Sequence, residues 1–185
     1  ATAGLINADF SQGFKYWSYR GYAYSKAPQY TKISQQATVD KETGILTFGD
    51  VSCCDEWVEA HPEDTHLYAG ISSTGLTFPD AVAGSTIFAT AEIRRTNGRV
   101  TLALQEHVSE AVDSNYRKDS ITTVYNGNGG DLNTSDEWIT TQTDDLTVTN
   151  TGSWFSLYIQ RYNGGGTQIR NIKIYMRTSD GTVYD

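Results

Sequence analysis

The sequence is poor in several features that would narrow its fold class. Its 185 residues include three prolines, one methionine and two cysteines, and no apolar run approaches the roughly 20 residues of a membrane-spanning helix. Cys53 and Cys54 are adjacent, so they cannot join distant strands, and a bond between them would close a strained ring. We predict two free thiols, and neither a disulfide framework nor a cysteine-based metal site.

Basic residues are also scarce. Lys and Arg total 14 against 22 Asp and Glu, which gives a formal net charge of −8 at pH 7. Contact with nucleic acid or with an anionic membrane surface needs clustered cations, and the densest group here is the pair Arg94 and Arg95. The sequence therefore predicts no nucleic-acid partner and no membrane partner.

The length favours a single domain. A chain of 185 residues buries roughly 70% of its unfolded surface in one core, and no linker or internal repeat divides it. We expect one domain over residues 1–185, with its core at about 5–177. Because the chain begins at Ala1 rather than Met, we expect a processed product or an excised domain. We also expect it to be part of a larger chain.

Short segments of alternating polarity make up much of the chain, and Gly/Asn turns separate them. Such a pattern predicts an all-β fold, an antiparallel β-sandwich or jelly roll. The "TNG" at residues 96–98 predicts a hairpin between the segments on either side of it. The predicted strands lie within residues 44–52, 85–95, 99–109, 120–125, 144–149, 153–162 and 167–177.

Alternation gives each predicted strand an apolar face and a polar face. On the apolar side we predict buried positions at Phe10, Trp17, Leu102, Leu104, Leu157 and Ile172. On the polar side the strands carry Glu92, Arg94, Gln105, His107, Tyr158 and Gln160. If these strands are neighbours in one sheet, their six polar side chains line one open face.

Three stretches carry a resemblance to a known family. "LINADFSQGFKYW" (5–17), the central "GLTFPDAVAGSTIFATAEIRRTNGRVTLAL" (75–104) and the closing "IRNIKIY" (169–175) resemble, in order, motifs of carbohydrate-binding modules of the galactose-binding-like jelly-roll superfamily, of the xylan- and glucan-binding type. The resemblance implies a jelly roll, saccharide binding, and a core position for Phe10 and Trp17. We expect residues 7–17 to form two short strands hinged by a turn.

The family's structural calcium site is where this sequence departs from the pattern. The resemblance implies ligands after the Phe and in the closing strand, and these positions hold Ser11 and Arg170. Calcium takes six to eight oxygen ligands, usually with carboxylates among them, and a guanidinium offers none. A salt bridge from Arg170 to Asp9 in place of the ion is one expectation. No cofactor is predicted, and bound calcium remains the disfavoured alternative.

Sugar recognition suits the residue types on the predicted polar face. Pyranose rings stack on Trp or Tyr, and their hydroxyls bind Arg, Glu, Gln and His. We therefore predict a binding site from the six polar residues, with Trp57, Tyr22 and Tyr24 at its rim. The alternatives are a solvated sheet face, a capping role for Trp57, and packing roles for the tyrosines.

Three functions remain open at this point. The first is non-catalytic binding of a polysaccharide or cell-wall saccharide by a module of a secreted glycanase or of a phage tail or baseplate protein, outside the cell or on a virion. The second is a jelly-roll polysaccharide lyase or hydrolase, although no catalytic motif occurs and no catalytic residue is predicted. The third is a structural or adhesion sandwich.

Overall fold

The computed structural model describes residues 7–21, 37–48, 68–73, 83–95, 99–107, 121–126, 135–162, 167–178 and 183–184. All the regular structure within these ranges is β-strand. None of the described residues belongs to a helix long and apolar enough to cross a membrane.

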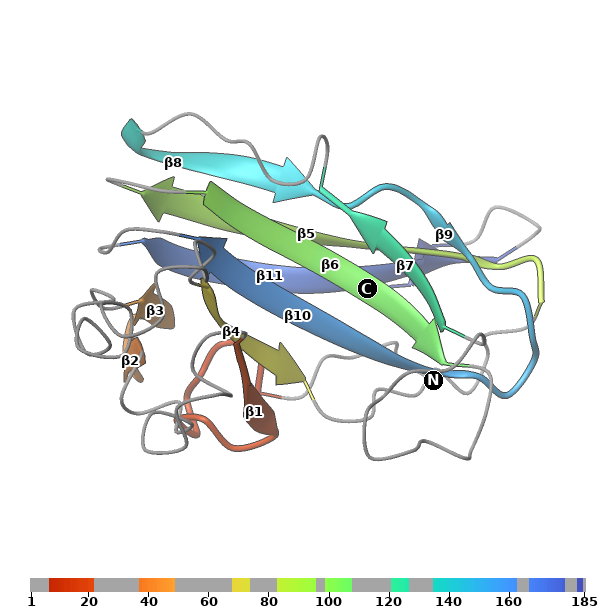
Figure 1. The fold of residues 1–185 in the computed structure, drawn as a ribbon, viewed down its shortest axis with the longest axis horizontal. Helices are drawn as coiled ribbons and strands as arrows, with labels where there is room; N and C mark the ends of the chain where they lie inside the picture. The colour runs from red at the N-terminus through yellow and green to blue at the C-terminus, as the bar shows by residue number, and fades with distance from the viewer. Residues whose placement is uncertain are drawn as a thin grey trace, which may run out of the picture.

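One layer is a five-stranded antiparallel sheet among the described residues, shown at the front of Figure 1. Its centre is the pair β10 and β6, which align along nine residue pairs. In sheet order its strands are β1 (Trp17–Gly21), β4 (Tyr68–Ser73), β10 (Trp154–Tyr162), β6 (Arg99–His107) and β7 (Ile121–Tyr125).

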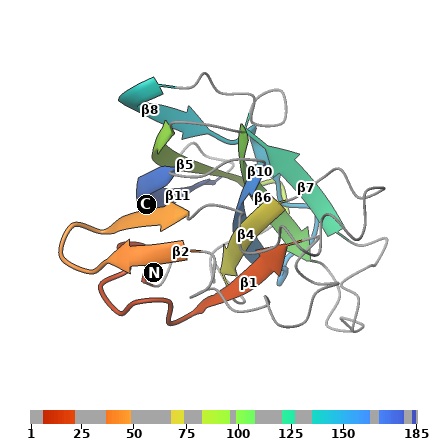
Figure 2. The same cartoon turned by 60° about the vertical axis from the view of Figure 1, so that its left-hand side comes forward.

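Within the described ranges the other layer is a seven-stranded antiparallel sheet, and Figure 2 shows the two layers beside each other. Its main path runs β2 (Ala37–Asp40), β3 (Ile45–Phe48), β11 (Gln168–Arg177), β5 (Thr86–Arg95) and β8 (Ser135–Gln142). Two short strands extend it, β9 (Leu146–Thr147) on β5 and β12 (Val183–Tyr184) on β11. The predicted all-β antiparallel sandwich is confirmed.

The core between the sheets is built from the apolar side of each alternating strand. Val100, Leu102 and Leu104, at even positions of β6, belong to one buried cluster. The same cluster contains the odd-numbered apolar residues of β5 and β10 and Ile169 of β11. The predicted core residues are all buried, as shown by Phe10, Trp17, Leu102, Leu104, Leu157 and Ile172. Alternation is reliable here because a pleated strand sends successive side chains to opposite faces.

The segment before β1 forms turns rather than the two expected short strands. The buried Asn7 amide holds these turns together, donating hydrogen bonds to the carbonyls of Gly13 at 2.9 Å and Lys15 at 2.8 Å. Trp17 Nε1 donates to the Asn7 carbonyl at 3.0 Å, and its ring lies 5.3 Å from that of Phe10. Polar side chains that bond the local backbone favour turns over a sheet ladder, which explains the difference.

The hairpin predicted at "TNG" is wrong. β5 pairs with β8, β9 and β11 in the seven-stranded sheet, whereas β6 pairs with β7 and β10 in the five-stranded sheet. The chain therefore passes from one layer to the other between these strands. Both strands send an apolar face into the same core. Alternation looks the same for strands that pair side by side and for strands that face each other across a core.

Candidate functional site

The six polar residues expected on one face lie on two. Glu92 and Arg94 belong to β5, and their side chains lie on the outer side of the seven-stranded sheet. Gln105 and His107 of β6 lie on the outer side of the other sheet, and Tyr158 and Gln160 of β10 join them. The prediction of a single open face is wrong, because the chain changes layer between β5 and β6. The three predicted rim residues, Trp57, Tyr22 and Tyr24, lie outside the described residues and stay predictions.

The outer side of the five-stranded sheet, here called the five-stranded face, has its side chains arranged in cross-strand rows. Ala103 of β6 lies between Tyr125 of β7 and Tyr158 of β10. In the next row Gln105 lies between Thr123 and Ser156, and in the row after that His107 is opposite Trp154. Residues paired directly across antiparallel strands turn their side chains to the same face and touch.

A chain of hydrogen bonds links four polar side chains of this face. Gln105 Nε2 donates to Thr123 Oγ1 at 3.1 Å, and Ser156 Oγ donates to Gln105 Oε1 at 3.2 Å. His107 Nε2 lies 2.8 Å from Ser156 Oγ. A serine hydroxyl has one proton, and here Gln105 receives it, so we assign the Nε2 proton to His107. The network thus fixes the orientation of both the amide and the imidazole.

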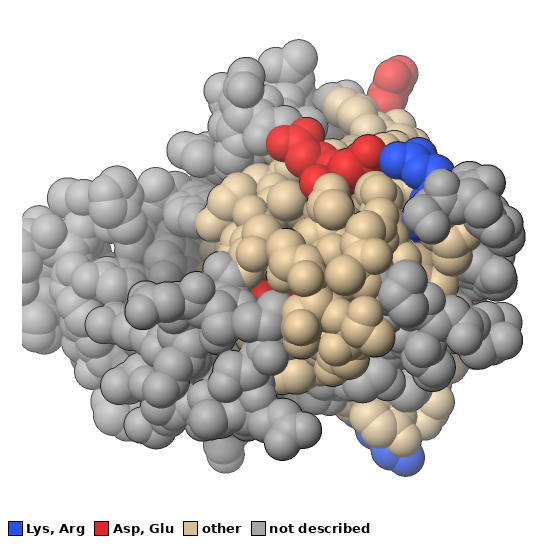
Figure 3. All heavy atoms as spheres, turned by 90° about the vertical axis from the view of Figure 1, so that its right-hand side faces the viewer, with Lys and Arg blue, Asp and Glu red and all other residues tan. Residues whose placement is uncertain are grey.

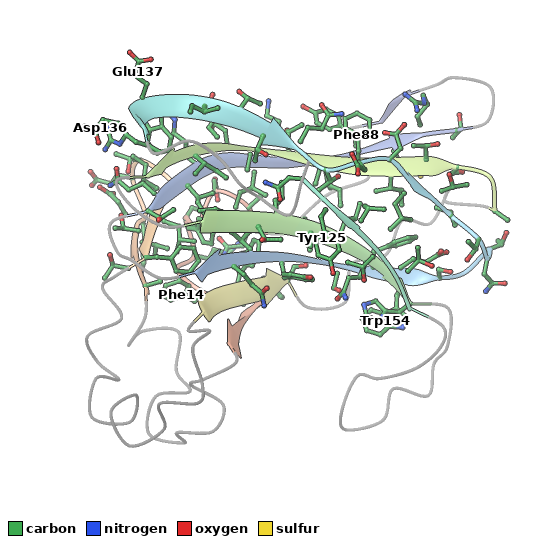
Figure 4. The ribbon with its side chains drawn as sticks, turned by 45° about the horizontal axis from the view of Figure 1, so that its top comes forward. Phe14, Phe88, Tyr125, Asp136, Glu137 and Trp154 are labelled. Carbon is green, nitrogen blue, oxygen red and sulfur yellow. The ribbon has the colours of Figure 1, made fainter. Side chains whose placement is uncertain are left out.

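Aromatic rings adjoin this network. The imidazole of His107 stacks on the Trp154 indole with ring centroids 3.7 Å apart and planes 5° from parallel. Figure 4 shows Trp154 at the start of β10 and Tyr125 on β7, where 43% of Tyr125 is exposed. By contrast His107, Ser156 and Tyr158 are buried. A simply solvated sheet face would leave such residues exposed, so the solvated-face alternative does not describe these positions.

The outer side of the seven-stranded sheet, here called the seven-stranded face, carries a cluster of charged residues. Arg170 Nε donates to Glu92 Oε2 at 2.6 Å, and Asn171 Nδ2 donates to the same oxygen at 3.0 Å. The hydrogen bond from Arg170, with smaller contributions from Asn171 and the charge of Lys173, lowers the pKa of Glu92 below its ordinary value of 4.5. Arg94 donates from Nε and Nη2 to Gln168 Oε1.

The residues at the implied calcium position do not fit the ion. Arg170 pairs with Glu92 and not with Asp9, so the suggested Asp9–Arg170 salt bridge is wrong. Asp9 Oδ1 accepts from the Ser11 backbone N–H at 3.1 Å, and this hydrogen bond lowers the pKa of Asp9. Within the described part of the chain, no group of three or more His, Cys, Asp or Glu residues is placed to hold a metal.

Two tryptophans at these sites were missed by the sequence analysis. Trp154 shares a face with Ser156 and Tyr158 by simple alternation along β10, so the pattern could have found it. Trp138 lies in β8, whose sequence "SDEWITTQ" has too few apolar residues to predict a strand. Its ring lies 4.0 Å from the guanidinium carbon of Arg170.

Carbohydrate-binding modules of the β-sandwich superfamily are among the solved structures that this fold resembles. TmCBM61, solved in complex with β-1,4-galactotriose, matches with a TM-score of 0.50 and 14% identity, over 94% of this chain and 97% of that one. A family 16 carbohydrate-binding module matches with a TM-score of 0.46 and 14% identity, over 75% and 84% of the two chains.

A phage protein shares the fold as well. The enzymatically active domain of tailspike protein 4 of bacteriophage CBA120 matches with a TM-score of 0.51 and 12% identity, over 94% of this chain and 21% of that one. Comparison of the sequence with family models and with curated proteins gives no match. At these identities the likeness establishes the fold, and it confirms the resemblance to carbohydrate-binding-module structures.

Proposed function

We propose that this chain is a non-catalytic carbohydrate-binding module whose five-stranded face binds a polysaccharide or cell-wall saccharide. The observation that carries the proposal is the oriented network from Thr123 through Gln105 and Ser156 to His107, stacked on Trp154. Amide, hydroxyl and imidazole groups of fixed orientation suit sugar hydroxyls, and an indole suits the C–H face of a pyranose. The half-buried Gln105, Thr123 and Trp154 would contact the saccharide, whereas the buried His107 and Ser156 would hold Gln105 and Trp154 in place. Such preorganised groups lose little freedom when they bind.

The acidic residue of β6 is not placed to act as a catalytic carboxylate on the five-stranded face. Glu106 turns into the sandwich and is 0% exposed. Its carboxylate accepts hydrogen bonds from the backbone and hydroxyl of Thr149, the backbone of Asn150 and the hydroxyl of Ser153. Glycoside hydrolysis needs two carboxylates that reach the scissile bond, and a carboxylate engaged in this way does not reach one.

The similarity to a tailspike enzyme domain keeps a lyase or hydrolase as the second candidate function. Incubation with the bound polysaccharide, followed by a reducing-sugar assay and absorbance of unsaturated products, separates the two. We expect neither signal above a heat-denatured control. A turnover-dependent signal that survives further purification would contradict the non-catalytic proposal.

We place the module in a larger protein that acts outside the cell or on a virion. A secreted glycanase and a phage tail or baseplate protein are both consistent with the proposal. The tailspike match supports the second setting, because there the shared fold covers 21% of a longer chain. In either setting the binding module would hold its parent protein on a saccharide surface.

A glycan array followed by calorimetry tests the proposed function, with β-1,4-galactotriose among the first probes. We expect dissociation constants between micromolar and millimolar, about −8 to −4 kcal/mol, because an open face leaves much of a ligand wet. Trp154→Ala should weaken binding about tenfold or more, since it removes the stacking ring. Phe88→Ala is the matched control, because Phe88 is a half-buried aromatic stacked on Tyr175 of the other face. Equal binding by the parent and by folded Trp154→Ala would contradict the proposed face.

A further inference from the structure

Two arginines converge on one tryptophan of the seven-stranded face. The guanidinium carbon of Arg170 lies 4.0 Å from the centroid of the Trp138 ring, and that of Arg94 lies 5.0 Å from it. The three residues come from three adjacent strands, β11, β5 and β8. Contact with an aromatic ring stabilises a cation most when that cation is partly removed from water. Arg94 and Arg170 are called the arginine pair below.

Both guanidinium groups of the arginine pair are held through their Nε atoms. Arg170 Nε bonds Glu92 at 2.6 Å, and Arg94 Nε bonds Gln168 Oε1 at 2.8 Å. Gln168 is itself anchored, because its Nε2 donates to Thr47 Oγ1 at 3.3 Å. The planes of the two guanidinium groups are therefore set before any ligand arrives, and preorganised donors bind with less entropic cost.

The charges of this cluster do not balance. Glu92 neutralises Arg170, and the charge of Lys173 also acts on Glu92. Arg94 is bonded to the neutral amide of Gln168, and no described carboxylate forms an ion pair with it. Figure 4 shows Asp136 and Glu137 projecting from the end of β8. Among the described residues, Arg94 thus carries a positive charge with no carboxylate partner, and its side chain is half-buried, in a chain whose net charge is −8.

We propose that the arginine pair is a second glycan site, one that binds the anionic group of an acidic polysaccharide. That group is the carboxylate of a uronate or a sulfate ester, since a guanidinium fork binds either with two parallel hydrogen bonds. Trp138 keeps the fork in place. The site is separate from the five-stranded face, because it lies on the outer side of the other layer of the sandwich.

A matched control for Arg94 lies on β11, the strand that carries Arg170. Arg177, at the far end of β11, pairs with Asp145 at 3.1 Å, and both side chains are largely exposed. Figure 3 views the end of the sandwich that lies on the right in Figure 1, where acidic and basic side chains gather in contact. Arg177→Gln removes one positive charge, as Arg94→Gln does. The charge removed at Arg177 is already balanced by Asp145, whereas that at Arg94 is not balanced by a described carboxylate. The chain is acidic overall, so it does not attract polyanions non-specifically. Any residual non-specific attraction would be weakened equally by Arg94→Gln and by Arg177→Gln.

The experiment measures binding to three soluble polymers at about physiological salt, where long-range attraction is screened. The polymers are polygalacturonate, dextran sulfate and neutral galactan, and the readout is affinity electrophoresis with calorimetry. We expect the parent to bind at least one anionic polymer more tightly than galactan, with a loss of about tenfold in Arg94→Gln and less than twofold in Arg177→Gln. The polymer that shows this dependence identifies carboxylate or sulfate as the bound group.

A second variant tests the same claim without removing the arginine. Gln168→Glu puts a carboxylate where the Gln168 amide now accepts from Arg94, and so neutralises the arginine. It should therefore weaken binding of the anionic polymer as much as Arg94→Gln does. Binding of the parent to neither anionic polymer above galactan would overturn the proposal, as would an equal loss in Arg177→Gln. Binding of uncharged β-1,4-galactotriose should be the same in parent and Arg94→Gln, so failure of this site leaves the proposed function standing.

Discussion

The outer faces of the two sheets use polar side chains in different ways. On the five-stranded face His107, Ser156 and Gln160 are only 5–6% exposed. Hydrogen bonds link His107 to Ser156 and Ser156 to Gln105. On the seven-stranded face Glu92 and Arg170 keep 30% and 35% of their side-chain exposure and form an ion pair. Both faces looked alike in the sequence.

The difference follows from the cost of removing each kind of group from water. A buried neutral group costs little once it is hydrogen-bonded, whereas a buried charge costs much more even when it is paired. The hydrogen-bonded amide and hydroxyl groups can therefore lie beneath the surface, and the ion pair remains at it. Substitution of a buried hydrogen-bonded group should consequently cost more stability than substitution of an exposed ion-paired group. The following substitutions test this in order of decreasing effect.

The largest effect is expected at Glu106, which lies on β6 of the five-stranded sheet but turns its fully buried carboxylate into the sandwich, away from the five-stranded face. Glu106→Gln places an amide N–H₂ against the donors of Thr149, Asn150 and Ser153. We expect a loss of about 3 kcal/mol in the free energy of unfolding, because buried donors lose their acceptor. Urea denaturation measures it, with the exposed Asp136→Asn as the control. A loss below about 1 kcal/mol would show that the loop is held by other contacts.

A smaller loss is expected at Ser156, in the middle of the polar network. Ser156→Ala removes the hydroxyl that His107 Nε2 and Gln105 Oε1 share. We expect about 1–3 kcal/mol less stability by urea denaturation, together with weaker binding of the glycan identified on the array. Unchanged stability and unchanged affinity would mean that the network neither supports the sheet nor orients the site.

The smallest effect is expected at Glu92, on the exposed side of the comparison. Glu92→Gln should lower the melting temperature at pH 7 by less than Ser156→Ala does, because solvent screens an exposed ion pair. The folded-state pKa of Glu92 is lowered by Arg170, so its stabilisation is present above the ordinary value of 4.5 and is lost as pH falls through the folded value. The melting temperatures of parent and variant should therefore converge in acid. A gap that stays constant as the pH is lowered from 7 to well below 4.5 would contradict this origin.

The sequence predicted the strands whose apolar residues alternate strongly. β5, β6, β10 and β11 fall within their predicted ranges, and each contributes to the buried core. β2, β4 and β8 were missed. β8 has the sequence "SDEWITTQ" and β4 has "YAGISS", so neither has the apolar period that marks a half-buried strand. Such strands form because they add to an existing sheet edge or lie between strands already in place, a tertiary effect outside any local window.

The sequence predicted correctly which site residues come together on strands that are neighbours in one sheet. It did not predict which residues are separated because the chain passes from one sheet to the other between β5 and β6. Gln105 and His107 came together with Tyr158 and Gln160 because β6 and β10 are neighbours in one sheet. Glu92 did not join them, because alternation does not state which layer a strand enters. Its ion pair with Arg170 joins residues far apart in sequence, and only the register of β5 against β11 brings them into contact.

The indole N–H signals of the four tryptophans provide the most direct test that a neutral glycan binds the five-stranded face. They are assigned by single Trp→Phe variants and followed by ¹H–¹⁵N NMR during titration with the saccharide identified on the array. We predict that the Trp154 signal shifts in a saturable way while the signals of the buried Trp17 and of Trp138 on the other face stay fixed. A saturable shift at Trp138 with none at Trp154 would contradict it and move the neutral site to the seven-stranded face.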